Sequence, residues 1–385
     1  MDTNIKILHA NDDNHNLGGA FLIAYRVEKY LRAKGFSYDY LSMDKFDIEC
    51  TDFPIPSDDK VYSANLRENR WLGHFLLPFY VNKVLHENKY NLIHIDSDAA
   101  WKALLYAIPA KKNGVKVLIH SHSTGIDGDA KSIKMVFDKV AKKILPHYTD
   151  CYIACSKEAA EWMAPYGDLS KIKVVFNGID FGKFHYDENE RQEYRTKYGI
   201  HENTLVLGNV AMLMERKNQK FIVEILKCIS DKGIDAKLVL VGDDKNEYGD
   251  CLKEYFKHIG LDGKVIFIGL NPNVRQFLNM MDVYVFPSYF EGAPLALYEA
   301  QATGLNCIAS DTISRDAVIS DWCYQKSLKD GTKAWAEAIL EFQLNKRDRN
   351  LKILENKYSI TGMAKELSKL YEEIIVSKRQ LWKEL

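Results

Sequence analysis

Short apolar runs alternate along the chain with longer segments whose apolar residues recur every three or four positions. The runs lack a strict alternation of apolar and polar residues, which is typical of strands buried on both faces, as in a parallel sheet. In the first half of the chain these runs are residues 5–10, 37–42, 90–96, 115–123 and 150–156. Helix-like segments follow them, among them residues 99–112, 130–147 and 156–164. The alternation predicts a doubly wound α/β layer.

The same pattern begins again after the turn signal Asn177-Gly178 and a charged segment. The later strand candidates are residues 204–213, 236–242, 263–269, 282–288 and 306–310. Two series of similar size predict two Rossmann-like domains, residues 1–177 and 178–360, with a helix over 361–385 that packs back on the first domain. Because ligands bind at the carboxyl ends of strands in open parallel sheets, we expect both domains to direct loops toward a central cleft.

Composition narrows the class of protein. The 385 residues are 46% hydrophobic with a net charge of −1, which is ordinary for a soluble protein and gives no support for nucleic-acid binding. The seven scattered cysteines favour reduced thiols in a cytoplasmic protein. Cys151 and Cys155 lack histidines at metal-site spacing, so we interpret them as core. We find no signal peptide and no apolar stretch of the roughly 18–20 residues that a bilayer span needs.

Two glutamates flank the predicted start of a helix in the second domain. Glu291 follows the strand-like DVYVFPS, and Glu299 lies eight positions later. Pro294 suits the first helical position, where no N–H is needed, and Gly304 is placed to end the helix. The helix start offers free N–H groups to a phosphate. Because the second acid lies about 8 Å along the axis, the carboxylates could contact opposite ends of a ligand with a diphosphate between them.

With Glu-x7-Glu after VFPS-x-x-EG-x-P, the sequence resembles the retaining GT-B glycosyltransferases of family 4, most of all bacterial enzymes of capsular or extracellular polysaccharide synthesis. The resemblance covers nearly the whole chain through the segments GGA, VLIHSHST, VVFNGID, VLVGDD, VIFIG and ASDT. It implies that the first domain binds a glycan or lipid-linked acceptor and the second a nucleotide-sugar donor. It also implies transfer of a hexosyl or N-acetylhexosaminyl group from a UDP-sugar, without a metal or other cofactor.

The resemblance assigns roles to the residues of the motif. Glu291 is expected to bind hydroxyls of the donor sugar, and Glu299 the ribose hydroxyls of the nucleotide. Gly18 and Gly19 would let the backbone of the first domain approach the phosphates, since a side chain would block that contact. The remaining donor-binding residues are expected to be Gly292, Ala293, Pro294 and Leu295, the last three through backbone contacts to the diphosphate. Without the resemblance, the acids read as solvated side chains and the glycines as an ordinary turn.

Two histidines end the strand VLIHSHS. By its place relative to the strand end, His122 corresponds to the active-site histidine of the family, whose backbone and ring lie near the transferring sugar. His120 is expected to point into the core. A purely structural role is the alternative for His122.

The chain departs from the family pattern after the first strand of the second domain. Alignment on KNQ makes Lys217 the lysine that neutralises the leaving diphosphate, but Met212 and Ala211 stand where the family has arginine and glycine. Methionine cannot donate a hydrogen bond to an anion. Either Arg216 replaces the charge, or another cation of the first domain does, or the enzyme is slow or inactive. The lost contact could lower the rate by about 10²-fold.

We find no obvious second carboxylate to act as a nucleophile. The resemblance implies catalysis by positioning and by stabilisation of the departing diphosphate. Asp243 and Asp244 follow a strand, but in this family that loop lies near the nucleotide, and we assign no metal to it. Two rivals remain: a sugar-nucleotide epimerase, and an inactive GT-B subunit that stabilises an active partner.

Two segments of the first domain suggest contact with a membrane. Residues 131–145 place Ile133, Phe137, Val140 and Ile144 at helical spacing. The lysines of this segment are Lys131, Lys134, Lys139, Lys142 and Lys143. With the aromatic segment 69–81, this helix could bind the surface of an anionic bilayer that carries a lipid-linked acceptor. The alternative is that the apolar stripe packs on the sheet and the lysines form a solvated face.

Overall fold

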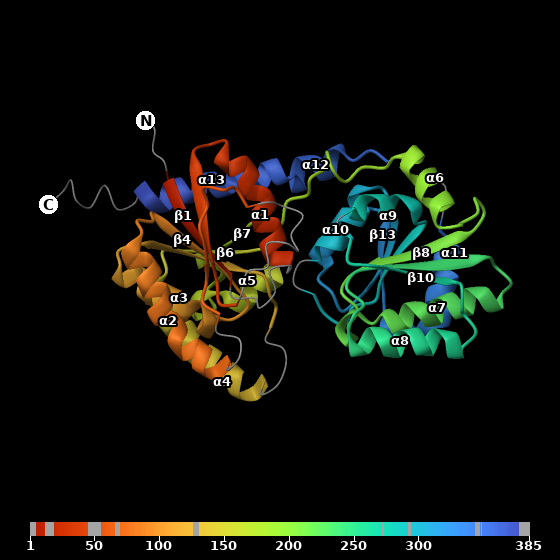
Figure 1. Ribbon diagram of the computed structural model, residues 1–385, viewed down its shortest axis with the longest axis horizontal. Helices are drawn as coiled ribbons and strands as arrows, with labels where there is room; N and C mark the ends of the chain where they lie inside the picture. The colour runs from red at the N-terminus through yellow and green to blue at the C-terminus, as the bar shows by residue number, and fades with distance from the viewer. Residues whose placement is uncertain are drawn as a thin grey trace. The chain divides into compact units, whose positions relative to one another are not determined.

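The chain divides into two compact units, an N-terminal unit of residues 1–178 with 360–385 and a C-terminal unit of residues 179–359 (Figure 1). The predicted boundaries lie within one residue of these. The computed structural model describes residues 5–11, 19–44, 55–65, 70–125, 131–271, 273–291, 294–342, 347 and 349–376. Each unit has its own parallel sheet covered by helices, so the predicted fold class is confirmed.

The described part of the N-terminal unit forms a seven-stranded sheet with the order β3-β2-β1-β4-β5-β6-β7 and parallel neighbours throughout. The strands are β1 (Ile5–Asn11), β2 (Phe36–Ser42), β3 (Val61–Ser63), β4 (Leu92–Ser97), β5 (Lys116–Ser121), β6 (Cys151–Ala154) and β7 (Ile172–Val174). The α-helices are α1 (Gly19–Arg32), α2 (Arg70–Glu87), α3 (Ala100–Lys112), α4 (Lys131–Ile144), α5 (Lys157–Met163) and α13 (Ile360–Val376). In Figure 1, α2, α3 and α4 lie on one face of this sheet, with α1 and α13 on the other.

The C-terminal unit forms a six-stranded parallel sheet with the order β10-β9-β8-β11-β12-β13 in its described residues. The strands are β8 (Leu205–Val210), β9 (Ala236–Val241), β10 (Val265–Gly269), β11 (Val283–Phe286), β12 (Asn306–Ser310) and β13 (Cys323–Lys326). The α-helices are α6 (Glu188–Lys197), α7 (Gln219–Asp231), α8 (Glu247–His258), α9 (Val274–Met280), α10 (Leu295–Ala302), α11 (Gly331–Leu340) and α12 (Lys352–Tyr358).

The strand order reverses direction beside the first strand of each sheet. In the N-terminal unit β1 lies between β2 and β4, and in the C-terminal unit β8 lies between β9 and β11. Open parallel sheets bind ligands at the carboxyl ends of the strands beside such a reversal. The loops that follow β1, β4, β8 and β11 are therefore the places where functional side chains are expected.

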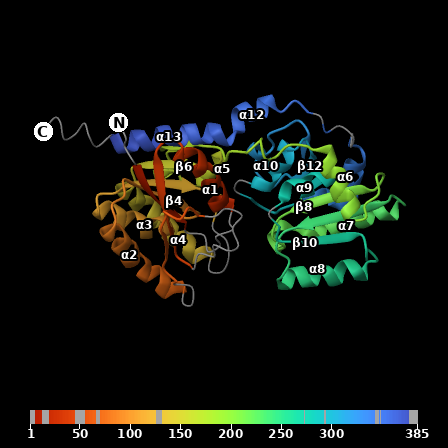
Figure 2. The same ribbon diagram turned by 45° about the horizontal axis from the view of Figure 1, so that its top comes forward.

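The C-terminal helix α13 belongs to the N-terminal unit and packs along α1 (Figures 1 and 2). The chain enters and leaves the C-terminal unit side by side, through the parallel bridge between Ile179 and Ser359. A Cβ atom on Gly178 would lie 2.5 Å from Cα of Ile360, so this close approach requires glycine. No helix in the described ranges combines the length and the apolar composition that crossing a membrane requires.

Candidate active site

The predicted Glu-x7-Glu segment lies at the switch point of the C-terminal sheet. Strand β11 leads to Glu291, and α10 begins at Leu295. Pro294 precedes the helix rather than opening it, because its ψ of 88° is not helical; it therefore occupies the N-cap position, one residue before the predicted one. Its carbonyl still accepts the N–H of Leu297 at 3.0 Å. Gly292 and Ala293, two predicted donor-binding residues, lie outside the described residues.

The C-terminal end of α10 is as predicted. Gly304 has φ +70°, the left-handed conformation in which glycine commonly ends a helix, and a Cβ there would meet the carbonyl oxygen of Arg347 at 2.6 Å. Glu299 lies inside α10 and is buried, with 7% of its surface exposed. It is therefore not the solvated surface acid that the sequence alone would suggest.

Lys217 and Glu291, which are 74 positions apart, meet in this loop region. Lys217 ends the short 3₁₀ segment Glu215–Lys217 that follows β8, and its Nζ lies 2.6 Å from Oε1 of Glu291. The side chains are only 17% and 9% exposed. Asn218 strengthens the junction, because its side-chain amide donates to the carbonyl of Pro287 at 3.2 Å. The two predicted residues thus form a partly buried, charge-assisted pair at the carboxyl ends of β8 and β11.

Arg216 also faces the segment around Glu291. Its guanidinium lies over the ring of Phe290, 5.1 Å from the centroid, and its carbonyl accepts the N–H of Tyr289 at 2.9 Å. Its buried Nε has no hydrogen-bond partner among the described residues. The side chain of Met212 is 41% exposed. A cationic side chain therefore remains beside Lys217, although the residue at the position of the family arginine is apolar.

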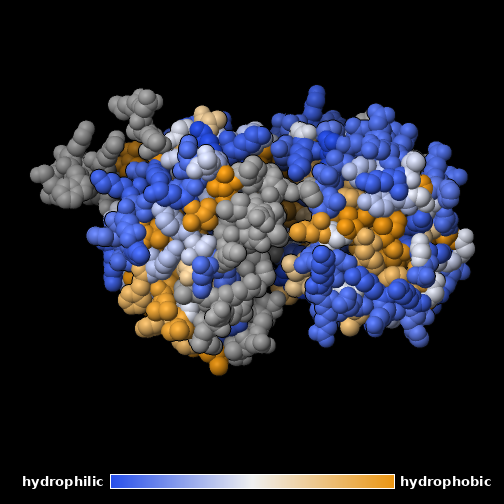
Figure 3. Space-filling view, in the orientation of Figure 1, coloured by the Kyte–Doolittle hydropathy of each residue, from blue (hydrophilic) through white to orange (hydrophobic). Residues whose placement is uncertain are grey.

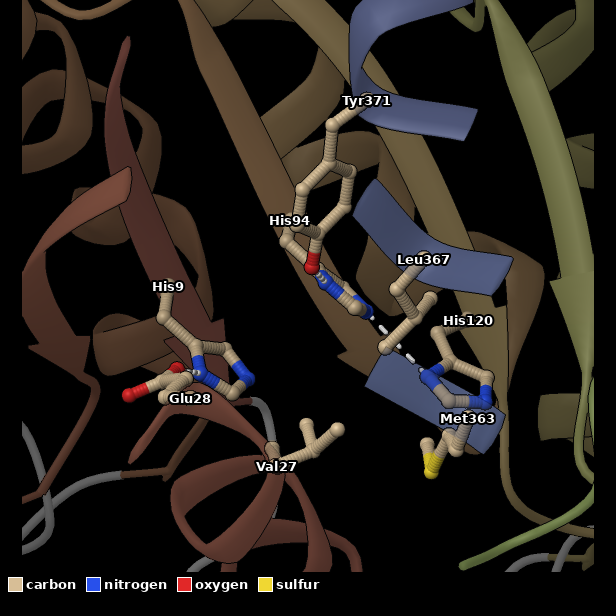
Figure 4. Close-up of a pocket in the computed structure, with 9 residues that line it drawn as sticks. His9, Val27, Glu28, His94, His120, Met363, Leu367 and Tyr371 are labelled. Atoms are coloured by element: carbon tan, nitrogen blue, oxygen red, sulfur yellow. Dashed lines mark hydrogen bonds and ion pairs between the residues drawn. The ribbon is translucent and has the colours of Figure 1, made fainter. Parts of the chain in front are cut away.

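A buried aspartate near the carboxyl end of β4 is surrounded by histidines of three neighbouring strands. Figure 4 labels three of these histidines, His9, His94 and His120. The histidine cluster consists of His9 of β1, His94 of β4, His120 of β5 and His122 just beyond β5, around Asp96 of β4. Oδ2 of Asp96 lies 2.7 Å from Nε2 of His9, and Oδ1 lies 3.0 Å from Nε2 of His122. His94 Nε2 and His120 Nδ1 each lie 3.4 Å from the same Oδ1.

The cluster extends beyond the sheet to two helices. Nδ1 of His9 lies 2.6 Å from Oε1 of Glu28 on α1, and Oε2 of Glu28 accepts a hydrogen bond from the hydroxyl of Tyr40 at 2.5 Å. Nδ1 of His94 lies 2.6 Å from the hydroxyl of Tyr371 on α13. Figure 4 shows His94 between Tyr371 and His120. A cavity of about 10 Å³, the room that one water needs, adjoins these side chains and the apolar residues of α13.

Charges inside the cluster separate its histidines into two classes. Burial opposes a charge on His9 and His122, but attraction and hydrogen bonds from Asp96 outweigh it and raise both pKa values to about 10. Burial lowers the pKa of His94, and burial together with His122 lowers the pKa of His120 to about 3. Burial also acts to raise the pKa of Asp96, but the charges of His9 and His122 hold it well below its usual value. Two cationic and two neutral imidazoles therefore share one carboxylate at neutral pH.

Within the part of the chain that the structure describes, the ligand atoms of His94, Asp96 and His120 lie within 4.8 Å of one another, a spacing that could hold a metal ion. Their mutual contacts, including 3.1 Å between His94 Nε2 and His120 Nδ1, are also those of a hydrogen-bonded group, and we assign no metal to them. At the other acidic pair that was considered, Asp244 binds Lys253 at 2.7 Å and Asp243 accepts the N–H of Lys245 at 3.1 Å.

The structure places the remaining predicted residues as follows. His122 lies at the end of β5, and His120 points into the core, as expected from their positions in the strand. Gly19 is the first residue of α1, whereas Gly18 lies outside the described residues. Sequence reasoning missed Asp96, His9 and Glu28. The available signal was that IKILHAN and LIHID each place polar residues in an otherwise apolar strand.

Comparisons with known proteins agree with this architecture. Residues 17–183 match the model of Glycosyltransferase Family 4, and residues 190–359 match that of Glycosyl transferases group 1. The chain is 30% identical to the putative glycosyltransferase EpsF of Bacillus subtilis over 267 residues, which cover 67% of each chain. It is 28% identical to UDP-Gal:alpha-D-GlcNAc-diphosphoundecaprenol alpha-1,3-galactosyltransferase of Escherichia coli over 250 residues, 62% of each chain.

The solved structures show the same fold. The crystal structure of HepE from Anabaena in complex with UDP-glucose matches with a TM-score of 0.78 at 18% identity, over 96% of this chain and 100% of HepE. Each family model covers most of one of the two Rossmann-like units. The alignment with the relative in Bacillus subtilis covers two thirds of both chains at 30% identity. The chain therefore belongs to the GT-B glycosyltransferases of family 4.

Proposed function

We propose that this protein transfers a hexosyl or N-acetylhexosaminyl group from a UDP-sugar to a glycan or lipid-linked glycan, with retention of configuration, in the synthesis of a bacterial cell-surface polysaccharide. The contact between Lys217 and Glu291 carries the proposal, because it joins the loops after β8 and β11 at the switch point of the sheet. The name of the relative in Escherichia coli, with UDP-Gal as donor and a diphosphoundecaprenol-linked acceptor, supports a UDP donor and a lipid-linked acceptor here.

The proposed roles follow from the charges of the site. Without a donor, the ammonium of Lys217 is bound by Glu291. A diphosphate offers this ammonium an anion of higher charge, so donor binding releases Glu291 to accept hydrogen bonds from sugar hydroxyls. Lys217 and the N-terminus of α10 then stabilise the departing diphosphate. Glu299 is proposed to bind the ribose, and Gly19 to allow close approach of the backbone to the phosphates.

Arg216 is proposed to supply the charge that Met212 does not. Arg216 precedes Lys217 in the chain, and its guanidinium stacks on Phe290, the residue before Glu291. Because Lys217 contacts Glu291, both cations face the same loop. An alanine at Arg216 is therefore expected to lower kcat, whereas an alanine at Met212 is expected to leave it nearly unchanged. If Met212→Arg instead creates activity in a wild-type protein that has none, the inactive-subunit hypothesis is favoured.

The deciding experiment combines a thermal-shift screen of nucleotide sugars with a transfer assay. One UDP-sugar should raise Tm selectively, because a ligand that binds only the folded state stabilises it. Lys217→Ala should lower kcat by about 10²–10³-fold, and Glu291→Ala should abolish measurable transfer. Lys227→Ala is the matched control, since it removes a lysine–carboxylate pair of the same unit, with Asp231 at the end of α7. Full activity of the Glu291 variant would refute the site assignment.

The same assay separates the proposed transferase from an epimerase. Incubation with a UDP-sugar alone should yield no epimer, and an epimeric product would sink the transferase proposal. Retention is read from the anomeric configuration of the product. The reaction is proposed to need no metal or other cofactor, so treatment with EDTA followed by dialysis should leave the rate unchanged.

We further propose that the N-terminal unit docks on an anionic bilayer through α2 and α4. The large exposed apolar side chains of these helices form the docking face: Leu72, Phe75, Leu76, Phe79, Ile133, Met135, Val136, Phe137, Val140 and Ile144. Figure 3 shows hydrophobic surface over this part of the N-terminal unit. The sequence left open whether the apolar stripe of α4 packs on the sheet. In the structure the stripe faces outward, because Val136 is 65% and Phe137 55% exposed.

The way α4 is anchored explains its orientation. Asp138 is 1% exposed and its Oδ1 accepts the N–H of Ala100 at 2.7 Å, which satisfies a free donor at the start of α3. Lys142 binds the same carboxylate at 3.0 Å. A polar anchor thus faces inward and the apolar stripe outward, while Lys139 and Lys143 are exposed to meet anionic headgroups.

Vesicle binding tests this face. The double variant Phe75→Ser/Phe79→Ser should bind vesicles of phosphatidylglycerol and phosphatidylcholine at least tenfold more weakly than the wild type, because two side chains that are 67% and 66% exposed no longer enter the bilayer. The control Leu270→Ser/Ile353→Ser removes apolar side chains of the C-terminal unit that are 60% and 77% exposed, and it should bind like the wild type. Equal binding by both variants, or no preference over neutral vesicles, would contradict the proposal.

A further inference from the structure

The histidine cluster requires a particular distribution of protons. Both nitrogens of His9 face carboxylate oxygens, Glu28 at 2.6 Å and Asp96 at 2.7 Å. An ionised carboxylate only accepts hydrogen bonds, so both nitrogens must donate and His9 is a cation. Asp96 uses one oxygen for this cation and offers the other to Nε2 of His122. His9 and Glu28 thereby fix the orientation of Asp96, and Asp96 fixes that of His122.

His122 is the member of the cluster that reaches the surface. Its side chain is 11% exposed, against 2% for His9, 4% for His94 and 1% for His120. It lies beyond the end of β5, at the edge where parallel sheets bind ligands. The buried members of the cluster therefore support His122 from the interior of the unit.

We propose that Asp96 is a positioning residue for glycosyl transfer: backed by His9 and Glu28, it holds His122 in one orientation and in its protonated form at the carboxyl edge of the N-terminal sheet. The inference rests on the proposed function, and it adds a second role for charge there. A fixed imidazolium at that edge attracts an anionic group of a substrate bound there.

The groups on the neighbouring elements are consistent with a charged His122 held by Asp96. His94 and His120 lie 3.4 Å from the same oxygen of Asp96, and their lowered pKa values keep them neutral, so they add no competing positive charge. Interaction with the buried sulfur of Cys155, which follows β6, also raises the pKa of His122. The hydroxyl of Tyr371 on α13 contacts His94 and not His122. Asp96 is the carboxylate that contacts His122 among the described residues.

The charge of His122 can be measured directly in the wild-type protein. In the full-length chain labelled with ¹⁵N-histidine, NMR should show both ring nitrogens of His122 protonated at pH 8, assigned by loss of the signals in His122→Gln. In Asp96→Asn the ring should be neutral at that pH. Burial disfavours the charged imidazole, and no carboxylate remains to offset that cost. A neutral His122 in the wild type at pH 8 would overturn the proposal whether or not any transfer is detected.

Kinetics separate positioning from a merely structural role. Asp96→Asn should lower kcat by about 10²-fold with less than a threefold change in KM for the donor, and the loss should grow as pH rises from 6 to 9. The control Tyr371→Phe removes a hydrogen bond at the other end of the cluster and should keep the wild-type pH profile. An Asp96→Asn enzyme with the wild-type kcat and pH profile refutes the role. If no donor supports transfer by the wild type, the proposed function fails while the NMR result stands.

Discussion

Two buried aspartates, one in each unit, make opposite use of the same chemical group. Asp282 precedes β11 in the C-terminal unit; its Oδ1 lies 2.5 Å from Arg191, and its Oδ2 lies 3.3 Å from Arg195 and accepts the N–H of Val206 at 2.7 Å. Asp96 is the penultimate residue of β4 in the N-terminal unit and is held by imidazoles. One carboxylate meets permanent cations, and the other meets cations that can lose their protons.

The difference follows the two edges of a parallel sheet. Asp282 stands at the amino edge of its sheet, where its partners tie α6 to the start of β11 and β8. Asp96 stands at the carboxyl edge, where ligands bind. Guanidinium groups stay charged at any pH of interest, whereas imidazoles change charge near neutrality when their environment allows. A buried acid is therefore expected to be structural at the first edge and functional at the second.

The largest effect that would test this comparison is loss of stability at the amino edge. Asp282→Ala leaves the buried Arg195 and the partly buried Arg191 without their carboxylate, which should lower the free energy of unfolding by about 3–5 kcal/mol. Urea unfolding at pH 7 measures it, with Asp231→Ala as control because Asp231 is exposed and paired with Lys227 on α7. Transfer activity per folded molecule should be unchanged. A loss of kcat with little loss of stability would reverse the assignment of the two edges.

The second effect is a pH dependence confined to the N-terminal unit. Folding raises the pKa of His9 and His122 from 6.5 to about 10, so their stabilisation is fully present below pH 6.5 and is lost as pH rises toward 10. Between pH 6.5 and 8 the loss should amount to roughly 2–3 kcal/mol. Hydrogen exchange in the full chain, followed on peptides of β1, β4 and β5, measures it.

Peptides of β8 and β11 serve as the internal control, because the partners of Asp282 do not titrate in this range. His9→Gln should reduce the slope for the N-terminal unit, since one of the two titrating cations is gone. A stability that stays flat or rises with pH in that unit would contradict the charge assignment of the cluster.

The two units also show which features could be predicted from the sequence and which could not. Alternating apolar runs predicted both sheets and the domain boundaries, because periodicity reflects burial directly. Alignment of KNQ with the family pattern predicted Lys217 as the lysine of the site, and the structure places its Nζ 2.6 Å from Oε1 of Glu291. Asp96 was not found, because its role depends on strands that are adjacent in space and far apart in the chain: His9 is 87 positions away.

Which face of α4 is exposed could not be predicted from the sequence, for a similar reason. Its apolar residues at helical spacing fit equally well a helix packed on a sheet and a helix facing outward. Only the tertiary contact of Asp138 with the start of α3 decides between them, by turning the polar side inward. The one-residue difference at Pro294 is local: its ring fixes φ and leaves ψ to the loop before α10, whose value of 88° keeps the residue outside the helix.

The smallest expected effect concerns the return of α13 to the histidine cluster. Tyr371→Phe removes a buried hydroxyl 2.6 Å from Nδ1 of His94 while keeping the ring, so the N-terminal unit should lose only about 1 kcal/mol. Urea unfolding followed on peptides of β4 measures the loss, and Phe36→Leu, which alters the ring that packs against Tyr371 without touching the cluster, is the matched control. Because His94 is neutral and Tyr371 does not contact His122, the pH profile of transfer should not move. A shifted profile in Tyr371→Phe alone would mean that charge at the carboxyl edge depends on the C-terminal helix, and that the cluster is set by α13 as well as by Asp96.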